Sequence, residues 1–258
     1  MKNREQRKNK MDDLIKIIAP KNRIEVLKNN WKDERSKRVV FLSHCLLNEN
    51  TRYMGGAFCG GINHEIIELF KQNDVGIVQT ACPERISWGG IYKKNVFQFF
   101  GVAYQRQFLF KLLNPFVNIS FRVLNRKMKG VAKYTANEIQ DYIKNGMEVV
   151  AFIGVGGSPS CGVYTTPDVK MYFSHSARMD ISKTSRSAHN EMLRKCTISG
   201  QGVFVKYLTR YLRRKKINIP MLEYNFFDEM DGKTNSLLQE LKPLLASSKK
   251  PNNNENTL

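Results

Sequence analysis

Short apolar runs recur along the chain and alternate with stretches of helical periodicity. The runs are rich in β-branched residues and lie at 38–43, 75–80, 149–155 and 219–224. Continuous apolar runs of this length are typical of strands that are buried on both faces of a parallel sheet. Their alternation with helices predicts an α/β fold: a mostly parallel, open, Rossmann-like sheet with helices on both faces.

The helical periodicity is clearest at 63–71 and at 203–216, and the second of these stretches is strongly basic. A further helix is predicted to begin at Thr135, which would cap it with Glu138 as the capping-box partner. The Asn-Gly pair at 145–146 is a good signal for its end. This helix would lead directly into the most apolar of the predicted strands.

The same pattern divides the chain into three parts. Residues 39–228 are predicted to form the α/β domain, and residues 1–38 a basic helical extension with weak helical periodicity at 11–18 and 24–31. Residues 229–258 are predicted to form a C-terminal helix followed by a tail rich in Asn, Lys and Pro. That composition is typical of disorder.

An insertion at about 91–130 interrupts the α/β pattern. Its phenylalanines and tyrosines, from Phe97 to Phe121, are interleaved with lysines and arginines. This composition predicts a helical insertion whose aromatic residues pack on the domain. Three functional interpretations remain open: a lid over the site, which we favour, a pair of helices on a membrane surface, or a nucleic-acid patch.

Charge and cysteine usage constrain the partners and the compartment. The net charge is +19, which attracts nucleic acid, anionic membrane surfaces or anionic small molecules. No apolar run approaches the roughly 18–20 residues of a membrane span, and no secretory signal is recognised. The five cysteines are dispersed along the chain. We therefore expect a cytoplasmic protein with reduced cysteines.

Three of the cysteines follow predicted strands directly. Cys45 and Cys82 come after the first two strands, and Cys161 follows the glycine-rich loop after the third. Because the carboxyl ends of parallel strands meet at one edge of a sheet, we expect the three thiols to converge there. Cys59 and Cys196 lack this context and are interpreted as ordinary buried cysteines.

The loop that ends at Cys161 combines Gly154, Gly156 and Gly157 with small polar residues. Such glycines allow a sharp turn and close approach to a bound group. The loop lacks the Lys-Ser/Thr ending of a Walker loop, and Pro159 stands at the third glycine of a dinucleotide fingerprint. The alternative to a ligand-binding loop is a glycine-rich turn that only ends the strand and carries a small buried cysteine.

Isolated cysteines favour some metal groups over others. Structural zinc sites usually use close Cys-x₂-Cys pairs, and the chain has none. Cysteines from distant segments, each beside small residues and backbone N–H groups, suit an iron–sulfur cluster. Three cysteine ligands on a [4Fe–4S] cluster leave one iron open to act as a Lewis acid or to bind sulfur. A zinc or redox-sensing protein remains an alternative.

These motifs together resemble the DUF523/TudS family, which is named for thiouracil desulfidase. The resemblance covers roughly Val39 to Glu223 and rests on the stretches 43–48, 52–56, 82–84, 89–90, 158–162, 200–204 and 220–223. It implies an α/β fold, an oxygen-sensitive [4Fe–4S] cluster, and the non-redox, hydrolytic removal of sulfur from a small thiolated nucleobase such as 2-thiouracil. The ligands that it implies are Cys45, Cys82 and Cys161.

Other residues receive roles from their position beside these motifs. Glu84 is the predicted general base, with Ser158, Ser160 and His44 as further catalytic candidates. Arg52, Asn48 and Gly157 are predicted to contact the substrate. Several have a structural alternative: loop capping for Glu84, a packed structural role for His44, turn formation for the serines and an ordinary ion pair for Arg52. His44 and Asn48 replace an alanine and a glycine of the family pattern, which alters the pocket around the first ligand.

A second function class competes with the enzyme. The charge and the aromatic insertion are compatible with an RNA-binding protein, or with an enzyme that acts on thiolated tRNA through its basic aromatic surface. Steep salt dependence of RNA binding would distinguish these possibilities from an enzyme that uses only small substrates.

Overall fold

The structure is a computed structural model that describes residues 23–31, 33–96, 107–176, 179–180 and 182–246. Its contacts divide the chain into two units, residues 1–36 and 37–258. In the first unit, helix α2 (Arg23–Asn30) confirms the helix predicted at 24–31. The helix predicted at 11–18 lies outside the described residues, as does the tail predicted to be disordered.

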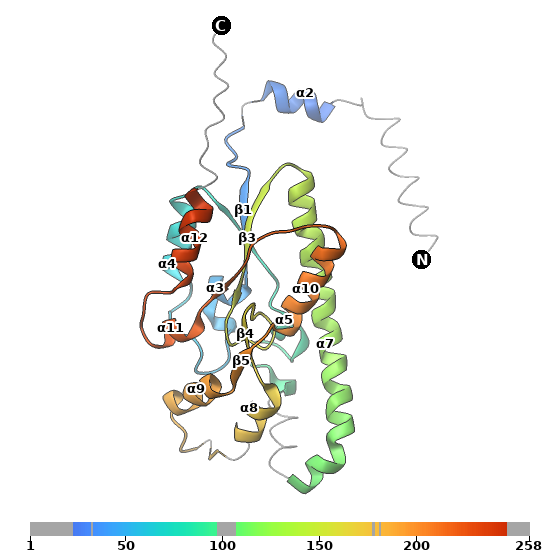
Figure 1. The fold of residues 1–258 in the computed structure, drawn as a ribbon, viewed down its shortest axis with the longest axis vertical. Coiled ribbons are helices and arrows are strands. Elements are labelled where there is room, and N and C mark those ends of the chain that lie inside the picture. Colours follow the sequence, from blue (N-terminus) through green and yellow to red (C-terminus); the bar gives the residue numbers. More distant parts are fainter. Residues whose placement is uncertain (1–22, 32, 97–106, 177–178, 181, 247–258) are drawn as a thin grey trace, which may run out of the picture. The chain divides into compact units, whose positions relative to one another are not determined.

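The second unit is built on a parallel sheet with the order β2-β1-β3-β6 (Figure 1). Each strand pairs in parallel with its neighbours, and the register between β1 and β3 shifts between Val39 and Val40. The strands coincide with the four predicted apolar runs: β1 (Arg38–Leu42), β2 (Gly76–Gln79), β3 (Glu148–Val155) and β6 (Met221–Tyr224). The predicted mostly parallel α/β fold is therefore confirmed.

Strand side chains alternate between two cores, one on each face of the sheet. Val40 and Leu42 of β1 belong to one core, whereas Phe41 points to the other. Both sets are fully buried, because helices cover both faces of the sheet (Figure 1). This explains why the strands appear in the sequence as continuous apolar runs. The first core is covered by α3 (His44–Leu47), α4 (His64–Lys71), α11 (Phe226–Met230) and α12 (Leu237–Ala246), and the second by α7 (Gln107–Lys144) and α10 (Val203–Arg214).

Helix α7 corrects one prediction and confirms another. Thr135 does not cap a helix: it is buried in the interior of α7, which runs through from Gln107 to Lys144. The helix continues because Met128, Ala132 and Ile139 form one buried stripe at helical spacing, and burial of that stripe outweighs the local capping signal. The helix ends where predicted, with Gly146 at a positive φ of 78° just beyond it.

The predicted insertion therefore has no boundary at 130, since its last part is continuous with α7. Residues 97–106, which carry several of its aromatic side chains, lie outside the described residues. Among the α7 residues whose side chains the structure describes (119 and 122–144), none lines the cavity discussed below, whereas Trp88, Lys93 and Val96 do.

A smaller layer lies beyond the carboxyl ends of the strands (Figure 1). It consists of an antiparallel pair of short strands and two helices. Its elements are β4 (Thr165–Pro167), α8 (Val169–Ser176), α9 (Arg186–Lys195) and β5 (Thr197–Ser199), and two short helices complete the fold, η1 (Glu49–Thr51) and α5 (Pro83–Ser87). None of the described helices is long and apolar enough to cross a membrane.

Candidate functional site

The three predicted ligand cysteines lie around one cavity at the carboxyl ends of the strands. Cys45 is in α3 just after β1, Cys82 follows β2, and Cys161 ends the loop after β3. All three line a cavity of about 120 Å³. The chain passes from β1 to β2 on one side and returns with β3 on the other, and such a reversal opens a crevice for ligands in α/β sheets. The sequence-based expectation that these thiols converge is met.

The loop that carries Cys161 folds back onto the strand that it leaves. The Val155 N–H donates to the Cys161 carbonyl at 3.1 Å. A Cβ on Gly154 would lie 2.1 Å from that carbonyl oxygen, so this position requires a glycine. Gly157 adopts a left-handed φ of 67° and donates its N–H to Thr165 Oγ1. The glycines thus set the path that brings Cys161 to the cavity.

Glu223 of β6 fixes the far end of the same loop. Its Oε2 accepts the backbone N–H groups of Val163, Tyr164 and Thr165 at 2.7, 2.6 and 3.0 Å, and its Oε1 accepts the Thr165 hydroxyl at 2.7 Å. Glu223 is 9% exposed. A nearly buried carboxylate that accepts this number of hydrogen bonds holds the loop in place.

Glu84 connects the second and third cysteine loops. Cys82 caps α5, with its sulfur accepting the Arg85 N–H, and Glu84 stands in the first turn of that helix. One carboxylate oxygen of Glu84, Oε1, accepts the hydroxyls of Ser158 at 3.1 Å and Ser160 at 2.9 Å. The predicted base and the two predicted serines therefore form one hydrogen-bonded group on the cavity wall.

Lys93 completes this group and was not predicted as a site residue. Its Nζ lies 3.2 Å from Glu84 Oε2 and 3.4 Å from the Thr51 carbonyl, and the residue is only 4% exposed. Its φ of 51° is unusual for a residue other than glycine. A buried lysine needs a partner to offset its lost hydration, and Glu84 supplies one.

Burial disfavours the thiolate form of all three cysteines. It raises the pKa of Cys82 to about 12, and it also raises the pKa of Cys45. The pKa of Cys161 is raised well above its ordinary value by burial and then by the nearby thiols of Cys45 and Cys82. Three mutually repelling thiolates need a cationic group between them. A metal group would supply that charge, and its binding would release the thiol protons.

The thiol arrangement fits a polynuclear group better than a single ion. Three thiolates on one tetrahedral zinc would lie about 3.8 Å apart, given Zn–S bonds of about 2.3 Å. Among the described residues, the three sulfurs do not form a group whose members all lie within 4.8 Å of one another. They surround a cavity instead, and the Ser160 hydroxyl lies 3.4 Å from Cys161 Sγ, within reach of a cluster-bound sulfur.

The remaining predicted residues occupy different positions. His44 and Gly157 line the cavity, and burial followed by repulsion from Arg85 lowers the pKa of His44. Arg52 also lines the cavity, and its guanidinium is held by two glutamates described below. Asn48 is not among the cavity-lining residues; its side chain accepts the Asn50 N–H and caps η1. Nine of the ten predicted residues are thus brought together.

Four aromatic side chains also line the cavity. Tyr53, Tyr172 and Phe226 line the cavity together with Trp88. The Tyr53 hydroxyl donates to Asn190 Oδ1 at 2.8 Å, and the Tyr172 hydroxyl lies 2.7 Å from His189 Nε2. Fixed aromatic rings of this kind suit a flat, partly apolar ligand. Tyr53 follows directly on Arg52 in a motif already noted; the other rings come from segments without any motif.

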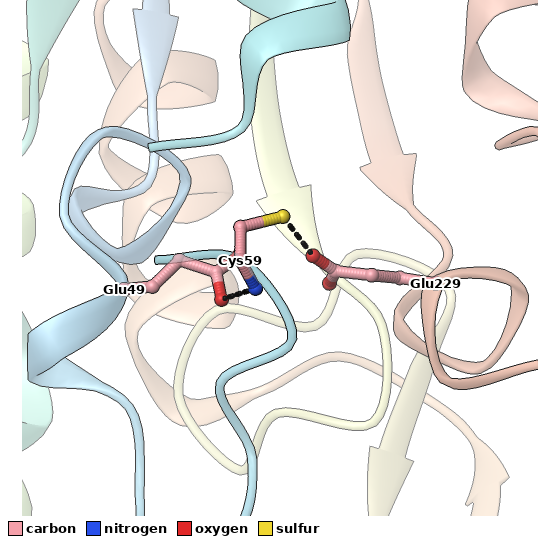
Figure 2. A group of neighbouring side chains, drawn as sticks. All are labelled: Glu49, Cys59 and Glu229. Carbon is pink, nitrogen blue, oxygen red and sulfur yellow. Dashed lines mark hydrogen bonds between the residues drawn. The ribbon is translucent and has the colours of Figure 1, made fainter. Parts of the chain in front are cut away.

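A second group of side chains is formed by Glu49, Cys59 and Glu229 (Figure 2). It surrounds Arg52, which lines the cavity. Glu49, Cys59 and Glu229 each place one potential ligand atom within 4.8 Å of the others. The Cys59 thiol donates to Glu229 Oε1 at 3.4 Å, and Glu49 Oε2 accepts the Cys59 N–H at 2.9 Å. Arg52 already pairs with both carboxylates, at 3.1 Å to Glu49 and 2.6 Å to Glu229. The group is therefore a buried ion-pair cluster whose positive charge is Arg52.

Comparison with curated proteins finds a similarity to an uncharacterized protein of Methanocaldococcus jannaschii. The two sequences are 26% identical over 137 residues, which cover 53% of this chain and 75% of that protein. No family model matches the chain, and no solved structure matches it. These comparisons assign no function, so the resemblance to the DUF523/TudS family stays a prediction.

Proposed function

We propose that this protein is an iron–sulfur-dependent desulfidase that removes sulfur from a small thiolated heterocycle of the thiouracil type. The observation that carries the proposal is the convergence of Cys45, Cys82 and Cys161 on one cavity whose wall also holds Glu84. All five cysteines are free thiols. This agrees with a reducing, cytoplasmic setting for the proposed enzyme.

The cysteines would hold a [4Fe–4S] cluster. When bound by three thiolates, such a cluster supplies a Lewis-acidic iron with an open position, which polarises a carbon–sulfur bond. The three thiols come from separate segments of the chain. The loop of Cys161, for example, is held by the hydrogen bonds that Glu223 accepts from it. The donor set is therefore positioned before any metal arrives.

The reaction replaces sulfur by oxygen without net electron transfer. A water forms the new carbon–oxygen bond, the carbon–sulfur bond breaks, and the sulfur leaves as hydrogen sulfide with both water protons. Glu84 would accept the first proton, while Ser158 and Ser160, which donate to its Oε1, would orient the attacking water. Lys93 would balance the charge of Glu84 through its contact with Oε2.

Substrate contacts would come from other residues that line the cavity. Tyr53, Tyr172 and Phe226 would flank the planar ring. Arg52 and Gly157 would contact its polar edge, and His44 would donate a proton or a hydrogen bond near Cys45. Asn48 contributes to the local turn instead, through its cap on η1.

The proposal is tested by anaerobic reconstitution with iron and sulfide, followed by metal analysis and by assay of sulfide release from 2-thiouracil. We expect about four irons and four sulfides per chain, and sulfide release that depends on them. Cys161→Ala should lose the cluster and the activity together, because it removes one of three ligands.

Cys196→Ala is the matched control, because Cys196 is a buried cysteine outside the cavity lining. It should keep both cluster and activity. A reconstituted protein that contains only zinc, or no metal, would refute the desulfidase. Activity with an intact cluster in Cys161→Ala would refute the ligand set.

A further inference from the structure

Two neighbouring helices carry stripes of exposed basic side chains that the proposed chemistry does not use. On α7, Arg122, Arg126, Lys129 and Lys133 are exposed and follow one another at spacings of four, three and four residues. On α10, Lys206, Arg210 and Arg213 are exposed at spacings of four and three. Residues at these spacings share one face of a helix. We call the seven residues together the basic face.

The two stripes belong to helices that pack against each other (Figure 1). Gln140 continues the α7 stripe seven residues after Lys133, and its Oε1 accepts a hydrogen bond of 2.6 Å from Lys215 at the end of α10. The basic side of α7 is thus turned toward α10. Along α7 alone, the stripe from Arg122 to Lys133 extends about 16 Å at 1.5 Å per residue.

Acidic side chains do not neutralise the basic face. Helix α10 contains no Asp or Glu, and neither does the stretch of α7 from 119 to 137. Among the residues that the structure describes, none of the seven basic side chains takes part in an ion pair. Like charges in two stripes on packed helices repel one another, so an extended polyanion would bind favourably and a single small anion would leave most of the face unpaired.

The buried side of α10 argues against a lipid surface as the partner. A helix that lies on a membrane inserts an apolar side into the lipid. In α10 that side, with Phe204, Leu208 and Leu212, is already buried in the core of the domain. On α10 only the charged side remains exposed, whereas α7 also exposes Ile119 and Val123 near Arg122. A phosphodiester backbone needs nothing more than such a charged side.

We propose that the basic face binds the phosphate backbone of RNA. Helix α7 also packs against α5, the helix that begins after Cys82 and carries Glu84. A strand held on the basic face therefore lies on a helix that packs against an element of the cavity wall. The choice of RNA over DNA rests on the proposed function, because uracil is a base of RNA. Binding itself does not depend on the cluster and is measured without it.

The test is the salt dependence of binding of the full chain to a fluorescein-labelled RNA of about 20 nucleotides, longer than typical single-strand binding sites. The variant carries four reversals: Arg122→Glu, Arg126→Glu, Arg210→Glu and Arg213→Glu. We expect its affinity at about 50 mM salt to fall at least about 100-fold. The slope of log affinity against log salt should flatten by about three, at roughly 0.7 per lost phosphate contact.

The control carries four reversals of exposed lysines elsewhere on the domain, with the same change in net charge: Lys71→Glu, Lys170→Glu, Lys195→Glu and Lys242→Glu. It should keep the wild-type slope. Circular dichroism checks that both variants fold. If the charge reversals impair folding, the same four arginines are changed to glutamine and binding is measured with that variant.

Equal losses in the variant and the control would overturn the proposal, since binding would then follow net charge rather than the basic face. Tighter binding of a DNA of the same sequence would overturn the assignment to RNA. The proposal would also be overturned if binding to phosphatidylserine vesicles depended on the four arginines and RNA binding did not depend on them. Sulfide release is assayed separately, so failure of RNA binding leaves the desulfidase proposal intact, and failure of the desulfidase leaves RNA binding intact.

Discussion

Lys93 and Lys94 are adjacent in the sequence and chemically identical, yet they have opposite environments. Lys94 is exposed, whereas Lys93 is 4% exposed and pairs with Glu84. The turn at Gly89 and Gly90, both at positive φ, folds the chain so that one of the two lysines points inward. Burial of an ammonium group is costly, so its contact with Glu84 has a large effect on stability.

We predict strong energetic coupling between Lys93 and Glu84. Lys93→Met should lower the free energy of unfolding by about 3 kcal/mol, because Glu84 is left as a nearly buried carboxylate without its cation. Adding Glu84→Gln should recover most of this loss. Urea unfolding of the wild type, both single variants and the double variant measures the coupling. Lys94→Met is the control and should change stability little; additive losses would contradict the pairing.

Cys59 shows how a neighbouring carboxylate controls a thiol. Burial, followed by the charges of Glu49 and Glu229, raises the pKa of Cys59 to about 11. At pH 8 its thiolate fraction should be about two orders of magnitude below that of an ordinary cysteine. The rate of alkylation of Cys59 by iodoacetamide, followed by mass spectrometry, should therefore rise about tenfold per pH unit from pH 8 to about pH 10.

Glu229→Gln should speed this alkylation at pH 8, because it removes a negative charge that opposes the thiolate and leaves Arg52 nearby. Glu68→Gln, which changes an exposed carboxylate on α4, should have no effect. A rate that levels off near pH 8.5 in the wild type would contradict the raised pKa.

At the residue scale, the predictable part of the site was the part carried by motifs. The cysteines, Glu84 and the serines each stand beside a strand end or a glycine-rich turn, and these local signals can be recognised. Lys93 and Tyr172 have no such signal, because only packing distinguishes them from other lysines and tyrosines. Asn48 has the type of side chain that binds ligands, but it serves as a cap.

At the scale of elements, long-range burial overrides local rules. The capping box at Thr135 is a local signal, but the buried stripe of α7 extends on both sides of it and keeps the helix continuous. A long-range polar contact can also fix a local structure. Glu223 of β6 accepts the backbone N–H groups of three successive residues, Val163 to Thr165. The loop of Cys161 thus depends on a strand 60 residues away.

Glu223→Gln tests this dependence. The amide retains one acceptor oxygen but loses the charge, and its NH₂ group faces donors, so we expect a loss of about 1–3 kcal/mol in the free energy of unfolding. Iron content after reconstitution should fall as well, because Cys161 is no longer held in place. Glu240→Gln on α12 is the control for losing a carboxylate. Unchanged stability and iron content in Glu223→Gln would contradict the proposed role.

At the scale of the whole molecule, the topology creates the site. No cysteine is near another in sequence, and their convergence follows from four parallel strands in the order β2-β1-β3-β6, whose carboxyl ends share one edge. The net charge of +19, by contrast, follows from composition alone. The packing of α7 on α10 places two stripes of that charge on neighbouring helices.

The sequence by itself determined the strands, the fold class and the convergence of the three cysteines, because apolar periodicity and strand-end motifs are local and the parallel α/β topology follows from few rules. The tertiary structure decided what depends on contacts between distant segments: the burial of Lys93 against Glu84, the hold of Glu223 on the Cys161 loop, the commitment of Arg52 to Glu49 and Glu229, and the continuity of α7. Each of these is an energetic balance between partners far apart in the chain, and no local pattern encodes such a balance.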